Sequence, residues 1–127
     1  ATTIDTTELC FMKIDVEGFE TQVIRGGLAT LKQRQPLVVL EQHASEFVDG
    51  SSPALNLLAS LGYRFCWEDS PPMARTWLGR RIDDLRRVAF GVQRSIVTGE
   101  RVPGTNHSML VAVPPRFQAP LGLVPSA

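Results

Sequence analysis

Apolar residues in the first half of the chain alternate between short continuous runs and helical stripes. Residues 9–14 and 37–40 form apolar runs broken only at Lys13, which is typical of strands buried on both faces of a parallel sheet. Between them, apolar positions recur at spacings of three and four, which predicts a helix: Phe19, Val23, Ile24, Gly27, Leu28 and Leu31. The Gly26-Gly27 pair weakens this helix, so we expect a bend or restart there and an end at Pro36.

The same alternation continues to about residue 67. Ser51-Ser52-Pro53 is typical of a helix start, with a serine cap and proline in the first turn, and Gly62 predicts its end. A third strand follows over residues 63–67, and its aromatic side chains share one face: Tyr63, Phe65 and Trp67. Strands joined by helices in this way favour an α/β fold with parallel strands and right-handed crossovers.

The second half of the chain departs from this rhythm. Apolar positions from Leu78 to Ile96 alternate spacings of four and three, which predicts an inserted amphipathic helical segment over about residues 74–99, as one helix or two divided near Gly91. Arginines lie off this stripe: Arg80, Arg81, Arg86, Arg87 and Arg94. We interpret the segment as a structural excursion packed on the domain, with a lid or a partner-binding helix as the alternative. A last strand is predicted over residues 108–113, and an extended or disordered tail over residues 118–127.

Composition favours a single globular domain. The chain has 127 residues, 43% of them apolar, and its longest apolar stretches, 36–40 and 109–115, are too short to span a membrane. With no signal-peptide pattern at the start, the simplest prediction is a soluble cytoplasmic protein without a membrane partner. Cys10 and Cys66 each lie in an apolar run and are expected to be buried thiols, not a disulfide.

The zero net charge is unevenly distributed. Residues 1–70 carry five Lys/Arg and ten Asp/Glu, whereas residues 71–127 carry eight Arg and three acids. The basic half is interpreted as a solvated helix face, with a docking surface for an acidic partner as the alternative. Because no aromatic residues are interleaved with the arginines, a nucleic-acid partner is not expected.

The candidate chemistry lies where the first two strands end. Asp15 and Glu17 follow the first strand, and Glu41 and His43 follow the second. The carboxyl ends of parallel strands line the usual ligand crevice of open α/β sheets. We therefore expect Asp15 and Glu17 to orient a substrate hydroxyl or accept its proton.

Other residues near these strand ends are expected to contact the substrate. The substrate-binding candidates are Lys13, Gly18, Glu41 and His43. Purely structural roles are the alternative: Asp15 as a cap of the following helix, Glu20 as a first-turn acid, and Gly18 as a backbone requirement. His107 is expected to be structural.

Three segments together resemble a known family. Residues 13–20 (KIDVEGFE), 23–27 (VIRGG) and 36–41 (PLVVLE) look like the carboxy-terminal half of the FkbM-type family of S-adenosylmethionine-dependent methyltransferases. The resemblance is strong over residues 2–43 and returns weakly over residues 106–114, which are similar to the family's final strand. The arginine-rich segment 74–99 departs from the family.

This resemblance implies a Rossmann-like, seven-stranded methyltransferase sheet with the order 3-2-1-4-5-7-6 and its last strand antiparallel. The four strands predicted above would be strands 4-5-7-6, in a partial domain over residues 1–117. Such enzymes bind S-adenosylmethionine with a glycine-rich loop after the first strand and an acid after the second, and no G-x-G spacing occurs among the ten glycines. The implied function is therefore O-methyl transfer to a small-molecule or sugar hydroxyl, with most cofactor-binding residues upstream and this fragment alone inactive.

Three alternatives remain open at this point. Asp15, Glu17, Glu41 and His43 together suit magnesium or manganese, either to hold an acceptor diol or for metal-assisted phosphoryl hydrolysis. The hydrolase hypothesis lacks a partner lysine and a phosphate-binding loop. A non-enzymatic hypothesis is a half-domain that binds a partner, or a second copy of itself, through the exposed edge of strand 9–14.

Overall fold

The computed structural model describes residues 8–69, 77–90, 95–99 and 101–123. The chain divides into two compact units. The first comprises residues 1–67 and 98–127, and the second comprises residues 68–97. The candidate site residues all belong to the first unit.

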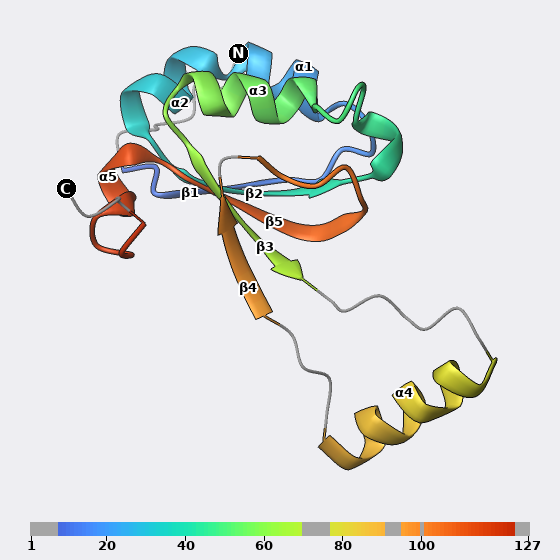
Figure 1. Cartoon of the computed structure of the whole chain (residues 1–127). Helices are drawn as coiled ribbons and strands as arrows, with labels where there is room; N and C mark the ends of the chain where they lie inside the picture. Colours follow the sequence, from blue (N-terminus) through green and yellow to red (C-terminus); the bar gives the residue numbers. More distant parts are fainter. Residues whose placement is uncertain (1–7, 70–76, 91–94, 100, 124–127) are drawn as a thin grey trace. The chain divides into compact units, whose positions relative to one another are not determined.

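The sheet has five strands in the order β1-β2-β5-β3-β4 (Figure 1). They are β1 (Phe11–Ile14), β2 (Leu37–Gln42), β3 (Arg64–Asp69), β4 (Ser95–Gly99) and β5 (His107–Val113). β1 and β2 are parallel, whereas β5 is antiparallel to both of its neighbours, β2 and β3. β3 therefore runs in the same direction as β2 although β5 separates the two. The chain thus has a mixed α/β fold, compatible with part of a methyltransferase domain.

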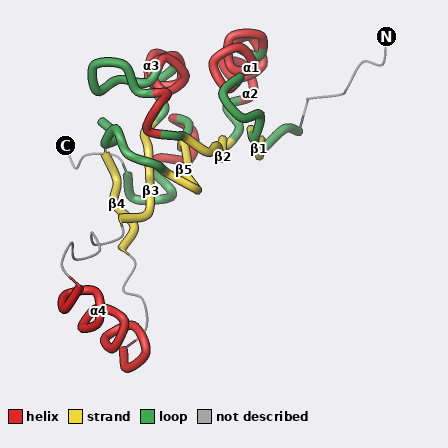
Figure 2. The backbone as a smooth tube through the Cα atoms, turned by 90° about the vertical axis from the view of Figure 1, so that its right-hand side faces the viewer, coloured by secondary structure: helices red, strands yellow, loops and turns green. Residues whose placement is uncertain are grey.

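Three helices cover one face of this sheet: α1 (Glu20–Gly26), α2 (Leu28–Arg34) and α3 (Pro53–Ser60) (Figures 1 and 2). The expected helix restart is confirmed, because α1 ends at Gly26 and α2 begins at Leu28. The predicted start of α3 is also confirmed. The Ser52 hydroxyl oxygen accepts a hydrogen bond from the Leu55 N–H at 3.4 Å, and Pro53 occupies the first helical position.

The core lies between these helices and the sheet. Alternate residues of each central strand are buried under the helices, and they include Val38 and Leu40 of β2 and Leu110 and Ala112 of β5. The predicted aromatic face of the third strand is confirmed by the burial of Tyr63, Phe65 and Trp67. The Tyr63 hydroxyl donates a hydrogen bond to the carbonyl of Pro36 at 2.9 Å, which ties β3 to the loop before β2.

The prediction that residues 9–14 are buried on both faces is wrong. β1 lies at the edge of the sheet, and the side chain of Phe11 is 55% exposed. Phe11 shares the face of the sheet opposite α1, α2 and α3, where Val39 and Val111 are only half-buried. The prediction that Cys10 is buried is also wrong, because its side chain is exposed. Cys66 is half-buried, and both thiols are free.

The predicted helical segment 74–99 is only partly helical. Residues 77–90 form α4 (Trp77–Phe90), but residues 95–99 form β4 beside β3. The β-branched residues Ile96, Val97 and Thr98 favour this strand, although Ile96 also fits the helical spacing. Within the second unit Leu78, Ile82 and Leu85 of α4 are exposed. The predicted helix division near Gly91 lies outside the described residues.

The end of the chain is folded further than expected. Residues 115–118 form α5 (Pro115–Gln118), and hydrogen bonds from Leu121 N to Phe117 O and from Leu123 N to Gln118 O close the following turns. An extended tail is therefore the wrong prediction for residues 118–123, whereas residues 124–127 lie outside the described range. The expected domain limits, 1–117 with an insertion over 74–99, stay a prediction. None of the described helices is long and apolar enough to cross a membrane.

Candidate functional site at the carboxyl edge of the sheet

The strand directions bring several loops to one edge of the sheet. β1, β2 and β3 all end there, and β5 begins there, because Gln42 at the end of β2 pairs with His107 at the start of β5. His107 is buried, and its Nε2 atom lies 2.8 Å from the carbonyl oxygen of Pro103. Its ring also lies beside those of Phe47 and Trp67, which matches the structural role expected for it.

The first pair of acids lies in an exposed turn after β1. Asp15 forms an ion pair with Lys13, with an Oδ2–Nζ distance of 3.0 Å and both side chains about half-exposed or more. Glu17 and Gly18 adopt left-handed backbone angles, with φ values of 44° and 94°. At Gly18 any side chain would be strained, so the expected backbone requirement is confirmed. Phe19, without a side-chain hydrogen bond, is the N-cap of α1, so the interpretation of Asp15 as a helix cap is wrong.

The second pair of candidates lies at the end of β2, with Glu41 in the strand and His43 directly after it. The His43 Nε2 and Glu41 Oε1 atoms are 3.9 Å apart, and both side chains are partly exposed. A protonated His43 would form an ion pair with Glu41 at this distance. The carboxylates of Asp15, Glu17 and Glu41 and the imidazole of His43 are thus all accessible to a ligand that reaches this edge of the sheet.

The four side chains do not form a metal site. Across the described parts of the chain, no group of three or more His, Cys, Asp or Glu side chains is arranged to hold a metal ion. All four candidate ligands, Asp15, Glu17, Glu41 and His43, are among the residues described. The structure therefore does not support the magnesium or manganese site considered from the sequence.

A buried polar network beneath this edge was not predicted. Glu20 is only 3% exposed, and its Oε2 atom accepts a hydrogen bond from the Gly18 N–H at 3.0 Å. Glu46 accepts hydrogen bonds from the His43 N–H at 2.7 Å and from Gln42 Nε2 at 3.0 Å. Gln42, also buried, accepts one from the Ser52 hydroxyl at 2.5 Å. These side chains connect the start of α1 to the start of α3.

Two features of the sequence were available to indicate this network. Gln42 lies on the same buried face of β2 as Val38 and Leu40. Glu20 lies one helical turn before the buried Ile24. Each is a polar residue at a core position, where an unpaired polar group is costly. A partner for each was therefore to be expected.

Burial raises the pKa of the Glu46 carboxyl above its usual value, and the hydrogen bond and charge of Glu20 raise it further. The hydrogen bond from the His43 backbone N–H opposes this effect. Glu20, whose carboxyl group adjoins that of Glu46, thus disfavours the ionised form of Glu46.

The family follows from a comparison with known protein families. A model of the methyltransferase FkbM domain matches residues 1–65, just over half of the chain. The chain belongs to the FkbM methyltransferase family. The matched region contains β1, β2 and both pairs of candidate residues, but not α4. No curated protein and no solved structure matches the chain.

The turn after β1 lacks the glycine-rich spacing that holds cofactors in many open α/β folds. The turn between β1 and α1 contains a single glycine, Gly18, and its other residues all carry side chains. No G-x-G spacing occurs in the sequence to let the backbone approach a methyl donor closely.

We predict that Glu46→Gln changes how stability depends on pH. Because the pKa of Glu46 is raised in the folded chain, its contribution to stability is present below its ordinary value of 4.5 and is lost as pH rises through the folded value. A glutamine keeps an oxygen acceptor for the His43 N–H but does not ionise. The stability of Glu46→Gln relative to the original chain should therefore increase with pH in urea titrations.

The control is Glu41→Gln, which removes a partly exposed carboxylate from the same edge. Its stability should differ little from that of the original chain, because a partly exposed carboxylate contributes little to stability. A Glu46→Gln curve parallel to that of the original chain at every pH would contradict the raised pKa of the Glu46 carboxyl.

Proposed function

We propose that this chain forms the acceptor side of an S-adenosylmethionine-dependent methyltransferase that methylates a hydroxyl group of a small molecule or sugar. The observation that carries the proposal is the placement of two accessible acids, Asp15 and Glu17, at the carboxyl edge of the parallel strands in the segment that matches the FkbM domain. Family membership favours methyl transfer over phosphoryl hydrolysis.

For methyl transfer the protein has to align the methyl donor with the acceptor and to accept a proton. S-adenosylmethionine supplies an activated methyl group when bound. Asp15 or Glu17 accepts a hydrogen bond from the acceptor hydroxyl and takes its proton as the oxygen becomes nucleophilic. Lys13 holds Asp15 through their ion pair and thereby positions its carboxylate. In this proposal Gly18, which has no side chain, leaves room for the acceptor in the turn after β1. Glu41 at the end of β2 and His43 just after it contact the acceptor.

The exposed edge of β1 suits a larger domain. Among the described strands only β2 pairs with β1, so the opposite edge of β1 presents free backbone groups. In the proposed whole enzyme the strands that bind S-adenosylmethionine pair with this edge. The four strands β1, β2, β5 and β3 would then be strands 4-5-7-6 of the methyltransferase sheet, with β4 as an addition.

An assay with a labelled methyl group tests the proposed reaction. The chain, extended upstream to include the proposed cofactor-binding strands, is incubated with methyl-labelled S-adenosylmethionine and mixtures of sugars or hydroxylated natural products. We expect labelled product that survives mild alkali, because methyl ethers resist base whereas methyl esters are hydrolysed. The control omits the acceptor mixture. Label lost in alkali would indicate a carboxylate acceptor and would contradict O-methylation of a hydroxyl.

A further inference from the structure

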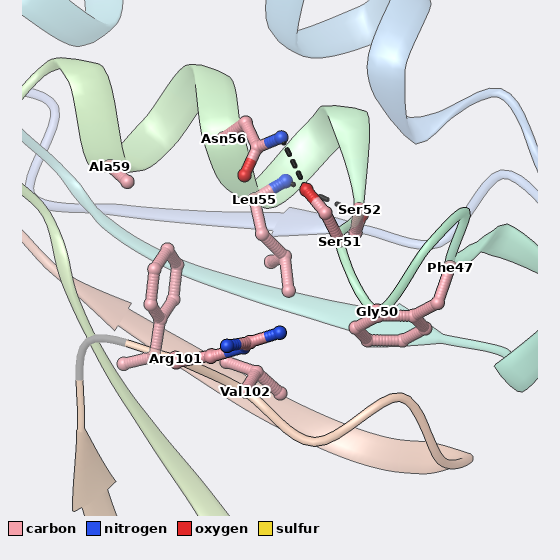
Figure 3. Close-up of a pocket in the computed structure, with 10 residues that line it drawn as sticks. Phe47, Gly50, Ser51, Ser52, Leu55, Asn56, Ala59, Arg101 and Val102 are labelled. Atoms are coloured by element: carbon pink, nitrogen blue, oxygen red, sulfur yellow. Dashed lines mark hydrogen bonds between the residues drawn. The ribbon is translucent and has the colours of Figure 1, made fainter.

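The first unit contains a pocket whose lining includes none of the four candidate residues Asp15, Glu17, Glu41 and His43. It has a volume of about 290 Å³ and lies between α3, the loop that follows η1 (Ala44–Glu46), and the residues before β5 (Figure 3). This volume is close to the lower end, about 300 Å³, of pockets that bind small molecules. Its lining is mostly apolar, from Phe47, Leu55, Ala59, Phe65 and Val102.

Arg101 gives this pocket its charge. It is the one ionisable residue among those that line the pocket, and its side chain forms no hydrogen bond or ion pair with another residue in the described parts of the chain. The guanidinium lies beside the loop at Gly50, where an added Cβ atom would come within 3.3 Å of Arg101 Nη2 (Figure 3). Gly50 has a φ of 74°, so the backbone there also favours glycine.

Two further hydrogen-bond donors line the same pocket. The Ser51 hydroxyl oxygen accepts a hydrogen bond from Asn56 Nδ2 at 2.6 Å, which leaves the hydroxyl hydrogen free to donate (Figure 3). Asn56 also keeps a second amide N–H. A positive guanidinium, a hydroxyl and an amide therefore lie along a largely apolar pocket, and none of its described lining residues is an acid.

We propose that this pocket binds a small organic anion, with its carboxylate or phosphate on Arg101 and its apolar body between Phe47, Leu55 and Phe65. An anionic ligand group can pair with the guanidinium of Arg101 through two parallel hydrogen bonds, because this exposed side chain has no partner among the described residues. The proposal concerns binding and holds whether or not the chain transfers methyl groups.

The test uses the whole 127-residue chain and three probes: benzoate, the neutral isostere benzamide, and inorganic phosphate. Backbone amide chemical shifts of Gly50, Ser51 and Asn56 are followed by NMR during each titration. We expect benzoate to shift these resonances and to bind about tenfold more tightly than benzamide, because a hydrogen bond to a charged group is worth more than one between neutral groups. Phosphate, which lacks an apolar body, should bind more weakly than benzoate.

Two variants with matched controls locate the site. Arg101→Gln should weaken benzoate binding about tenfold or more, and Arg25→Gln, on the exposed side of α1, should leave it unchanged. Ala59→Leu should fill the pocket and weaken all three probes, whereas Ala29→Leu, on α2, should not. Thermal unfolding by circular dichroism shows that each variant is folded. Benzoate binding that is absent, that equals benzamide binding, or that survives Arg101→Gln in the folded chain would overturn the proposal.

Discussion

Replacing Asp15 by asparagine or Glu17 by glutamine should lower the turnover of the extended enzyme by about 100-fold or more, since a positioned proton acceptor contributes about 10²–10⁴-fold to rate. Each replacement keeps the size and shape of the side chain but removes its ability to take a proton. Both acids lie in the exposed turn after β1, and Asp15 forms an ion pair with Lys13, whereas no ion pair of Glu17 is found among the described residues. The fold should therefore tolerate both changes.

The affinity for S-adenosylmethionine separates this role from a structural one. If Asp15 and Glu17 act on the acceptor, both variants should keep the affinity of the original enzyme, and turnover alone should fall. Loss of the Asp15–Lys13 ion pair should cost at most about 1 kcal/mol of stability, because exposed pairs contribute little. Matched controls are Asp84→Asn on α4 and Glu8→Gln before β1, both exposed. Unchanged turnover in both acid variants would show that the two acids are structural.

Local sequence chemistry predicted much of the first unit. The serine cap and proline at the start of α3, the restart after Gly26, and the aromatic face of β3 each depend on residues a few positions apart. Such short-range preferences act in the same way in most folds. The resemblance at residues 13–20, 23–27 and 36–41 also pointed to the FkbM family, which the matching domain confirms.

Long-range pairing explains most of what the sequence did not predict. The spacing from Leu78 to Ile96 fits a helix throughout, but the last residues of this segment instead pair with β3, about 30 residues earlier in the chain. The hydrogen bond between the carboxyl groups of Glu20 and Glu46 likewise joins residues that are 26 positions apart and belong to different elements. Neither partner is apparent from local periodicity.

The candidate sites also differ in whether local sequence or only long-range contacts indicate them. Asp15, Glu17, Glu41 and His43 were found because each lies at or just after the end of a strand, and strand ends are visible in the sequence. The pocket was not found, because Arg101 and Asn56 lie far apart in the chain and come together only when β5 inserts between β2 and β3. The absence of a metal-binding group among the described side chains also depended on geometry alone.

The central claim is that this FkbM chain supplies the acceptor side of the active site and that S-adenosylmethionine binds mainly to residues upstream. Calorimetric titration of S-adenosylmethionine into the 127-residue chain, and into the same chain extended upstream, tests it most directly. We predict no measurable heat of binding for the chain alone and a saturable binding isotherm for the extended chain, because the glycine-rich loop that approaches the cofactor is missing from this sequence. Tight binding to the chain alone would contradict the account.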